Sequence, residues 1–109
     1  MKGTNLGELE ELVLLVVGVL FDDAYGVAIQ KELEERCGRK VTISTIHVAL
    51  HRLEEKGFLE SRMGNATNER GGRRKLLFRV TRSGQAALQH AKEVRNDLWK
   101  AIPRAAFNV

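Results

Sequence analysis

Polar and basic side chains that can bond to nucleic acid gather on one face of the stretch at residues 43–59. Hydroxyl, imidazole and guanidinium groups donate hydrogen bonds to phosphates and to base edges in a DNA major groove, and a valine can touch a thymine methyl group. The candidate DNA-binding residues of this stretch are Ser44, Thr45, His47, Val48, His51, Arg52 and Lys56. We expect Thr45, His47 and His51 to lie nearest the bases, while Arg52 and Lys56 would contact the DNA backbone. The alternative interpretation is an ordinary amphipathic surface helix.

A second basic group begins within the polar, glycine-containing stretch at residues 64–72 and continues to residue 75. Glycines allow a close approach to a sugar-phosphate chain, and arginines can enter a minor groove or bind phosphates. The stretch lacks the lysine–threonine pair of a nucleotide-binding loop and does not open a helix, so a nucleotide site is not expected. The candidate DNA-binding residues here are Arg70, Arg73, Arg74 and Lys75. The alternative is a hairpin tip with solvated charge.

His47 and His51 also have the spacing of metal ligands, because residues four apart share one face of a helix. Glu54 and Glu55 lie one turn further on, so a metal-responsive regulator that uses the two histidines remains an alternative. No cysteine pair and no further ligands are evident, and we therefore predict no metal site and no cofactor.

Catalysis has little support in the sequence. Asp22 and Asp23 are interpreted as a helix boundary rather than as paired catalytic acids, and the serines lack a recognisable histidine and aspartate pattern. We therefore predict no catalytic residues and no enzymatic activity. A protein-binding adaptor is a further alternative, although it would not need the basic residues of the loop beside Arg52.

Composition indicates one small globular domain that binds a polyanion. The chain has 109 residues and a formal net charge of +4. Residues 1–37 hold three basic and eight acidic side chains, whereas residues 38–109 hold the other fifteen basic and six acidic ones. The single cysteine, Cys37, fits a reducing compartment. The longest apolar run, at residues 12–21, is too short to cross a bilayer, so we expect a cytoplasmic protein without membrane insertion.

Hydrophobic periodicity predicts how these groups are positioned. Residues 6–21 and 25–37 are expected to be helices, the second capped by Asp23 and ended by Gly38. Within the connection that follows, Val41 would form one short strand. The next helix is expected over residues 45–56, with Ser44 as its N-cap and Gly57 as its stop. Its buried stripe consists of Ile46, Leu50 and Leu53, with Ala49 beside them.

The rest of the chain predicts a wing and one last helix. Two strands, at residues 58–63 and 75–81, would flank the loop, and Thr81 would cap a helix that runs to about Ile102 and stops at Pro103. The expected fold is mainly α with a small β-hairpin. It comprises a winged helix-turn-helix domain at residues 1–82 and a C-terminal dimerisation helix and tail at residues 83–109.

Apolar residues on the first and last helices predict a homodimer. The first helix is apolar nearly all round, and the last helix has little of its own chain left to pack on. Trp99 is the only tryptophan, and it is either an interface anchor or a stacking surface for an effector. The candidate interface residues are Leu12, Leu15, Val16, Val19, Leu88, Ala91, Arg95, Leu98, Trp99 and Ile102. The alternative is packing within one chain.

In its motifs the chain resembles the short form of the PadR family of bacterial transcription regulators, over nearly its whole length. No single motif is specific, but their order and spacing together carry the resemblance. The motifs are Tyr25-Gly26, the stretch at residues 44–57 with Leu50, Arg52, Leu53, Glu54, Lys56 and Gly57, the run at residues 69–73, and Phe78-Arg79-Val80-Thr81 followed by Gly84.

The resemblance implies a winged-helix homodimer that represses genes by binding an inverted-repeat operator. It implies dimerisation through the first and last helices, and a loss of DNA affinity in some members when a small aromatic or drug-like molecule binds. Trp99, the only tryptophan, is our candidate contact for such a molecule. The chain departs from the family pattern at His47, where a tyrosine is usual, and at Val48, where a small residue or proline is frequent. Because the charge of an imidazole changes near neutral pH, we expect His47 to affect which operator is preferred and how binding depends on pH.

Overall fold

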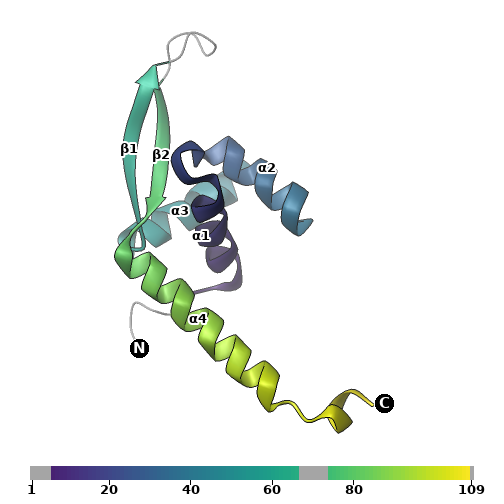
Figure 1. Cartoon of the computed structure of the whole chain (residues 1–109). Coiled ribbons are helices and arrows are strands. Elements are labelled where there is room, and N and C mark those ends of the chain that lie inside the picture. The colour runs from purple at the N-terminus through teal and green to yellow at the C-terminus, as the bar shows by residue number, and fades with distance from the viewer. Residues whose placement is uncertain (1–5, 67–73, 109) are drawn as a thin grey trace.

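The computed structural model of the chain describes residues 6–66 and 74–108. In order, its elements are α1 (Glu8–Leu20), the short 3₁₀ helix η1 (Phe21–Asp23), α2 (Gly26–Cys37), α3 (Ile43–Glu55), β1 (Leu59–Ala66), β2 (Arg74–Val80), α4 (Arg82–Ala101) and the 3₁₀ helix η3 (Arg104–Phe107). The predicted fold class, mainly helical with a small antiparallel hairpin, is confirmed (Figure 1). None of the helices in the described part of the chain combines the length and hydropathy that a bilayer crossing requires.

The core lies where α1, α2 and α3 meet. The predicted stripe on α3 is confirmed, because Ile46, Leu50 and Leu53 are fully buried. Leu14 of α1 and Ile29 of α2 are buried against the same cluster. These helices hold α3 by one side only and leave its opposite side to solvent.

Two N-caps and one predicted strand differ from the sequence-based predictions. Thr42, not Ser44, caps α3, since the Thr42 side chain accepts a hydrogen bond from the Thr45 amide at 3.3 Å. Tyr25, not Asp23, occupies the N-cap position of α2, because Asp23 belongs to η1. Val41 forms no strand, and its carbonyl instead accepts a hydrogen bond from the Gln30 side chain at 2.8 Å.

The two predicted glycine stops hold. Gly38 at the end of α2 has φ +65° and Gly57 after α3 has φ +79°, a left-handed conformation that glycine adopts without a Cβ clash.

The hairpin is anchored at its base and extends away from it. Leu59 pairs with Val80 and Met63 with Leu76, and the register becomes irregular between Met63 and Ala66. β1 runs to Ala66, so the predicted loop begins later than residue 64. At the base Phe58, Leu59 and Phe78 are buried.

Helix α4 begins against the hairpin and then leaves the domain. Thr81 caps it as predicted, accepting from the Gly84 amide at 3.0 Å. Gly84 and Ala87 are buried, whereas every residue from 92 to 108 is exposed. Figure 1 shows α4 running outward to the C-terminus, which makes the molecule 59 Å long and only 29 Å by 20 Å across.

Candidate DNA-binding interface

The outward side of α3 carries most of the residues predicted to read DNA. Ser44, Thr45, His47, Val48, His51 and Arg52 are all exposed. Val48 is 51% exposed although it is apolar, so a methyl contact to a ligand is open to it. The Thr42 hydroxyl lies 3.1 Å from the Ser44 hydroxyl and 2.9 Å from the Thr45 hydroxyl, forming a small hydroxyl cluster at the start of the helix.

The two histidines of α3 have different surroundings. His47 lies beside the first residue of α2, and a Cβ built on Gly26 would come within 3.2 Å of its Cε1 atom. Because glycine has no side chain, α2 and α3 can pack closely at this point. His51, one turn further along α3, lies 3.7 Å from Glu55, with both side chains largely exposed. Glu55 therefore adds an acidic group to the exposed side of α3, next to a predicted DNA contact.

Lys56, a predicted contact of the DNA backbone, also binds an acidic side chain of α1. Its Nζ donates to Glu10 Oε1 at 2.7 Å, which ties the end of α3 to the start of α1. The Glu10 side chain is only 12% exposed. Its burial opposes ionisation, but hydrogen bonds from Lys56 and the Gly7 amide, together with the charges of Lys56 and Arg52, outweigh this and lower the pKa of Glu10. Lys56 thus joins two helices, and its contact with the DNA backbone, like that of Arg52, stays a prediction.

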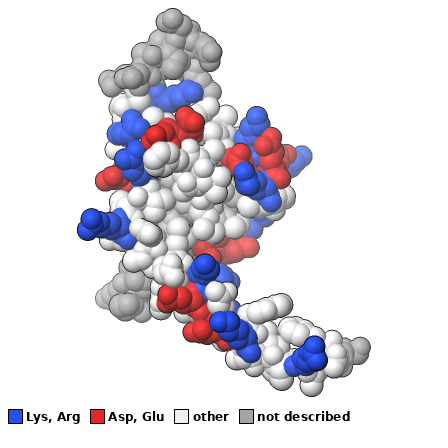
Figure 2. All heavy atoms as spheres, viewed as in Figure 1, with Lys and Arg blue, Asp and Glu red and all other residues white. Residues whose placement is uncertain are grey.

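The predicted wing contacts are described only in part. Arg70 and Arg73 lie outside the described residues, and Arg74 is the first residue of β2. Lys75 is described, and its ammonium lies 4.1 Å from the centroid of the Tyr25 ring. Figure 2 shows basic and acidic side chains interspersed over the hairpin, α2 and α4 on this face, so the charge asymmetry of the sequence forms no single patch in that view.

Within residues 6–66 and 74–108, no group of three or more histidine, cysteine, aspartate or glutamate side chains is placed to hold a metal ion. Asp22 of the predicted helix boundary binds Arg79 at 2.8 Å, which is a structural contact between η1 and β2.

The predicted interface residues separate into covered and uncovered positions. Val16 is only 4% exposed in a single chain, so it has almost no surface left to bury. Leu15 and Val19 on the same helix are 45% and 55% exposed, and Leu98 and Trp99 on α4 are 65% and 70% exposed. Leu12, Leu88 and Ala91 are half-buried, Ile102 is exposed, and Arg95 is exposed.

A groove of about 350 Å³ separates α1 from α4. Leu15 and Leu88 supply apolar surface to this groove. Arg95 of α4 donates to both carboxylate oxygens of Glu11 of α1, at 2.7 Å and 3.2 Å, and both residues line the groove. Trp99 lies further along α4, with its ring centroid 6.0 Å from that of Phe107.

Comparison with known proteins agrees with this architecture. The model of the transcriptional regulator PadR-like family matches residues 13–90. A PadR family transcription regulator from hypervirulent Clostridium difficile R20291 is 29% identical, with a TM-score of 0.69 over 86% of this chain and 93% of that one. A PadR family transcriptional regulator from Eggerthella lenta DSM 2243 is 27% identical, with a TM-score of 0.70 over 94% and 88%. The complex structure of hsRosR-S1 shares the fold at 24% identity, with a TM-score of 0.74 over 94% and 83%. No curated protein matches the sequence.

Proposed function

The chain belongs to the PadR-like family of transcriptional regulators, and from this premise we propose that it is a homodimeric repressor that binds an inverted-repeat operator. Members of the family are generally non-enzymatic DNA-binding proteins. The observation that carries the proposal is the exposed polar side of α3 beside the hairpin, in a chain whose α4 leaves apolar side chains uncovered.

In the proposed complex α3 lies in the major groove. Thr45, His47 and His51 face base edges, and Val48 reaches a thymine methyl group. Arg52 contacts the DNA backbone. The N-terminus of α3 lies near a phosphate, where free amides and the helix dipole favour negative charge.

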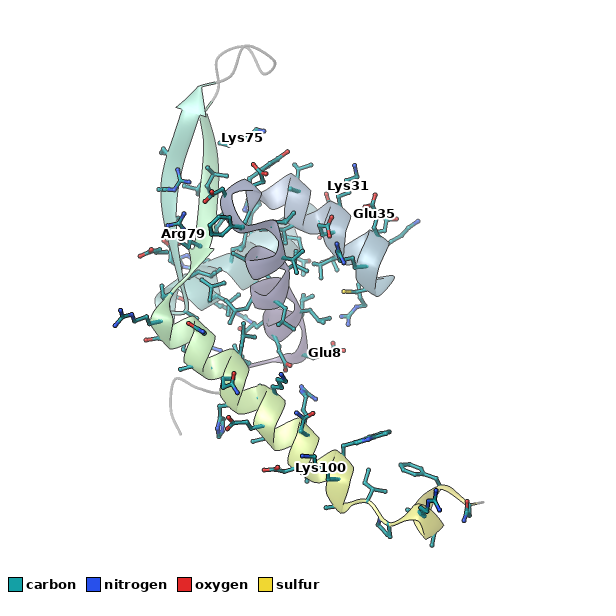
Figure 3. All side chains as sticks on the ribbon, viewed as in Figure 1. Glu8, Lys31, Glu35, Lys75, Arg79 and Lys100 are labelled. Atoms are coloured by element: carbon teal, nitrogen blue, oxygen red, sulfur yellow. The ribbon has the colours of Figure 1, made fainter. Side chains whose placement is uncertain are left out.

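The hairpin is proposed to grip the flanking minor groove. Lys75 supports this assignment because it lies on β2, the strand that leads back from the hairpin tip (Figure 3). Arg70, Arg73 and Arg74 are assigned to this contact from their types and positions in the sequence, since arginine binds phosphates and narrow minor grooves.

Dimerisation is proposed to bury the apolar side chains that a single chain leaves exposed. Large apolar residues in contact with solvent include Leu15 and Val19 of α1, Leu98 and Trp99 of α4, and Ile102 directly after α4. Burying apolar surface is favourable by about 25 cal/mol per Å². A two-fold dimer would place two copies of α3 about 34 Å apart, which is one turn of DNA.

Relief of repression by a small aromatic molecule is the remaining part of the proposal. Trp99 offers an exposed ring for stacking, and the α1–α4 groove has a volume within the usual range for small-molecule sites. A ligand held between the α4 helices would change the spacing of the two α3 helices, and affinity would fall because both no longer fit the operator at once.

Selection of bound fragments from random DNA duplexes tests the DNA part of the proposal. The selected duplexes should contain an inverted repeat, and His51→Ala should change discrimination among them. Arg73→Ala with Arg74→Ala should weaken all of them about equally and reduce the salt slope by about 0.9 log units for each phosphate that is no longer bound. Arg36→Ala, which removes a charge paired with Glu32 on α2, is the matched control and should change neither property. Binding that is unaffected by the His51 and arginine variants would refute the interface.

Analytical ultracentrifugation tests the dimer, which should sediment as two chains at micromolar concentration. A single chain at that concentration would contradict the proposal. The effector part is tested by Trp99 fluorescence, which an aromatic ligand that releases the DNA should quench. Release without quenching would remove Trp99 from the effector site.

A further inference from the structure

The corner between α1 and α2, residues 21–25, lies along the outer edge of the hairpin. The backbone amide of Phe78 in β2 donates to the Ala24 carbonyl at 2.8 Å, on the edge of β2 that β1 does not use. Ala24 is fully buried at this contact. An edge strand has backbone groups free for pairing, and here the corner accepts a hydrogen bond from one of them.

Two side-chain contacts reinforce this bond at separate points along β2. Arg79 Nη2 lies 2.8 Å from Asp22 Oδ1, and the guanidinium lies 5.6 Å from the centroid of the Phe21 ring. Four residues nearer the hairpin tip, the Lys75 ammonium lies over the Tyr25 ring. These two points are about 13 Å apart at about 3.3 Å per strand residue, so the corner is fastened to β2 over that length (Figure 3).

The backbone of the corner is itself constrained. Phe21 has φ +54°, the one positive value outside glycine in the described residues. A non-glycine residue adopts this conformation at an energetic cost and keeps it only where its surroundings hold it. The contacts from β2 to residues 21–25 are such surroundings.

The same corner also touches α3. Gly26 follows Tyr25 directly, and it is the residue on which a Cβ would come within 3.2 Å of His47 and 3.4 Å of Ile43. Two consecutive residues therefore face the two parts of the interface: Tyr25 faces Lys75 on the hairpin, and Gly26 faces His47 on α3.

We propose that Asp22 and Tyr25 are positioning residues for DNA binding, which set the direction of the hairpin relative to α3 by holding Arg79 and Lys75. This inference rests on the proposed function, in which hairpin and α3 contact one duplex together. Removing either contact leaves α3 in place and lets the hairpin turn away from the flanking DNA.

Hydrogen exchange of the free protein tests the positioning without DNA. Tyr25→Leu removes the aromatic ring while keeping an apolar side chain, and Tyr25→Phe keeps the ring. The Phe78 amide should exchange about threefold to tenfold faster in Tyr25→Leu and in Asp22→Asn, and at the wild-type rate in Tyr25→Phe. The buried amides of α3 should be unchanged in all three variants. Equal exchange at Phe78 in every variant overturns the inference, whatever the protein does to DNA.

Footprinting on duplexes selected with the wild-type protein tests the consequence. Tyr25→Leu and Asp22→Asn should lose protection of the flanking minor groove and bind about threefold to tenfold more weakly, while protection of the central major grooves persists. On duplexes trimmed of their flanks their affinity should equal that of the wild type. Glu32→Gln, which breaks the Arg36 ion pair on α2, is the control and should resemble the wild type on both duplexes.

The outcomes separate the two proposals. A wild-type protein that leaves the flanks unprotected contradicts the proposed wing contact. Flanks that the wild type protects, and that Tyr25→Leu and Asp22→Asn protect equally, contradict the positioning role alone. An equal loss of affinity on full and trimmed duplexes also overturns the positioning role, because that result indicates a general loss of folded protein. Asp22→Asn, whose carboxylate is exposed, keeps the test valid if Tyr25→Leu unfolds.

Discussion

The first turns of α4 and its last turns have opposite surroundings. At the first turns Gly84 packs against Phe58, which lies between α3 and β1, so closely that a Cβ there would lie 2.2 Å from the Phe58 carbonyl oxygen. From residue 92 onward every described side chain is exposed, including Leu98 and Trp99. One continuous helix thus passes from a packed environment to an unpacked one.

This difference separates what one chain stabilises from what it leaves to another molecule. A subunit buries the residues that its own fold can cover, and a large exposed apolar face indicates an interaction surface. The inner part of α4 therefore belongs to the folding of the single chain, while the outer part is the surface that the proposed dimer would bury. Substitutions at the two ends should then affect different measurements.

The largest effect is expected at the inner end, for Gly84→Ala. The added methyl group meets the backbone of Phe58 at 2.2 Å and Val80 Cγ1 at 2.9 Å, so α4 must move off the hairpin. We expect the free energy of unfolding to fall by about 3 kcal/mol or more, which chemical denaturation measures. Gly38→Ala, where a Cβ meets nothing within 4 Å and only the positive φ is strained, should cost less.

At the outer end, Leu98→Asp should break assembly and spare the subunit. An aspartate buried in the apolar interface of the proposed dimer loses hydration without a partner, so the dimer dissociation constant should rise at least about thirtyfold. Sedimentation measures this constant, and the far-ultraviolet circular dichroism of the subunit should not change. Asn108→Asp adds the same charge beyond the helix and should leave the constant unchanged. Unfolding of the Leu98→Asp subunit would show that the outer half also supports the fold.

The contact between Glu10 of α1 and Lys56 belongs, like the inner end of α4, to the folding of one chain. The pKa of its carboxyl is lowered in the folded protein, so the Glu10–Lys56 contact contributes stability above the ordinary value of 4.5 and loses it as pH falls below that value. Glu10→Gln should lower the free energy of unfolding by about 1–2 kcal/mol at pH 7. The difference from the wild type should shrink in denaturation curves as the pH falls below 4.5. A difference that grows toward low pH would contradict a lowered pKa of Glu10 in the folded protein.

The smallest effect is expected for Arg95→Gln. Its partner Glu11 is the neighbour of Glu10 but reaches outward to α4, where the Arg95 side chain is 63% exposed. Exposed ion pairs are screened by water and salt, so the melting temperature should change by less than about 2 °C. Calorimetry at two salt concentrations measures it. A larger shift would mean that α1 holds the outer half of α4 more firmly than its exposure indicates.

Local patterns predicted the elements well because they depend on nearby residues. The stripe of Ile46, Leu50 and Leu53, the stop at Gly57 and the cap at Thr81 all follow from spacing and side-chain type. The cap of α3 was predicted wrongly because Thr42 and Ser44 both offer a hydroxyl, and the choice depends on where the connection from α2 ends.

Contacts between distant parts of the chain could not be predicted in this way. Lys56 and Glu10 are 46 residues apart, and nothing in the local pattern of α3 indicates that the lysine turns toward α1. The apolar sequence of α1 likewise does not indicate that Leu14 is fully buried while Leu15 is 45% exposed. Tertiary packing decides both, and it also brings Tyr25 under Lys75.

The length of α4 turns small angles into large displacements. Its 20 residues span about 30 Å at about 1.5 Å per residue. With its inner end fixed by the close contact at Gly84, a tilt of about 5° moves the far end by about 2 to 3 Å. In the proposed dimer, a molecule the size of one aromatic ring, bound at the far end of α4, would therefore move the rest of each subunit by a distance comparable to a hydrogen-bond length.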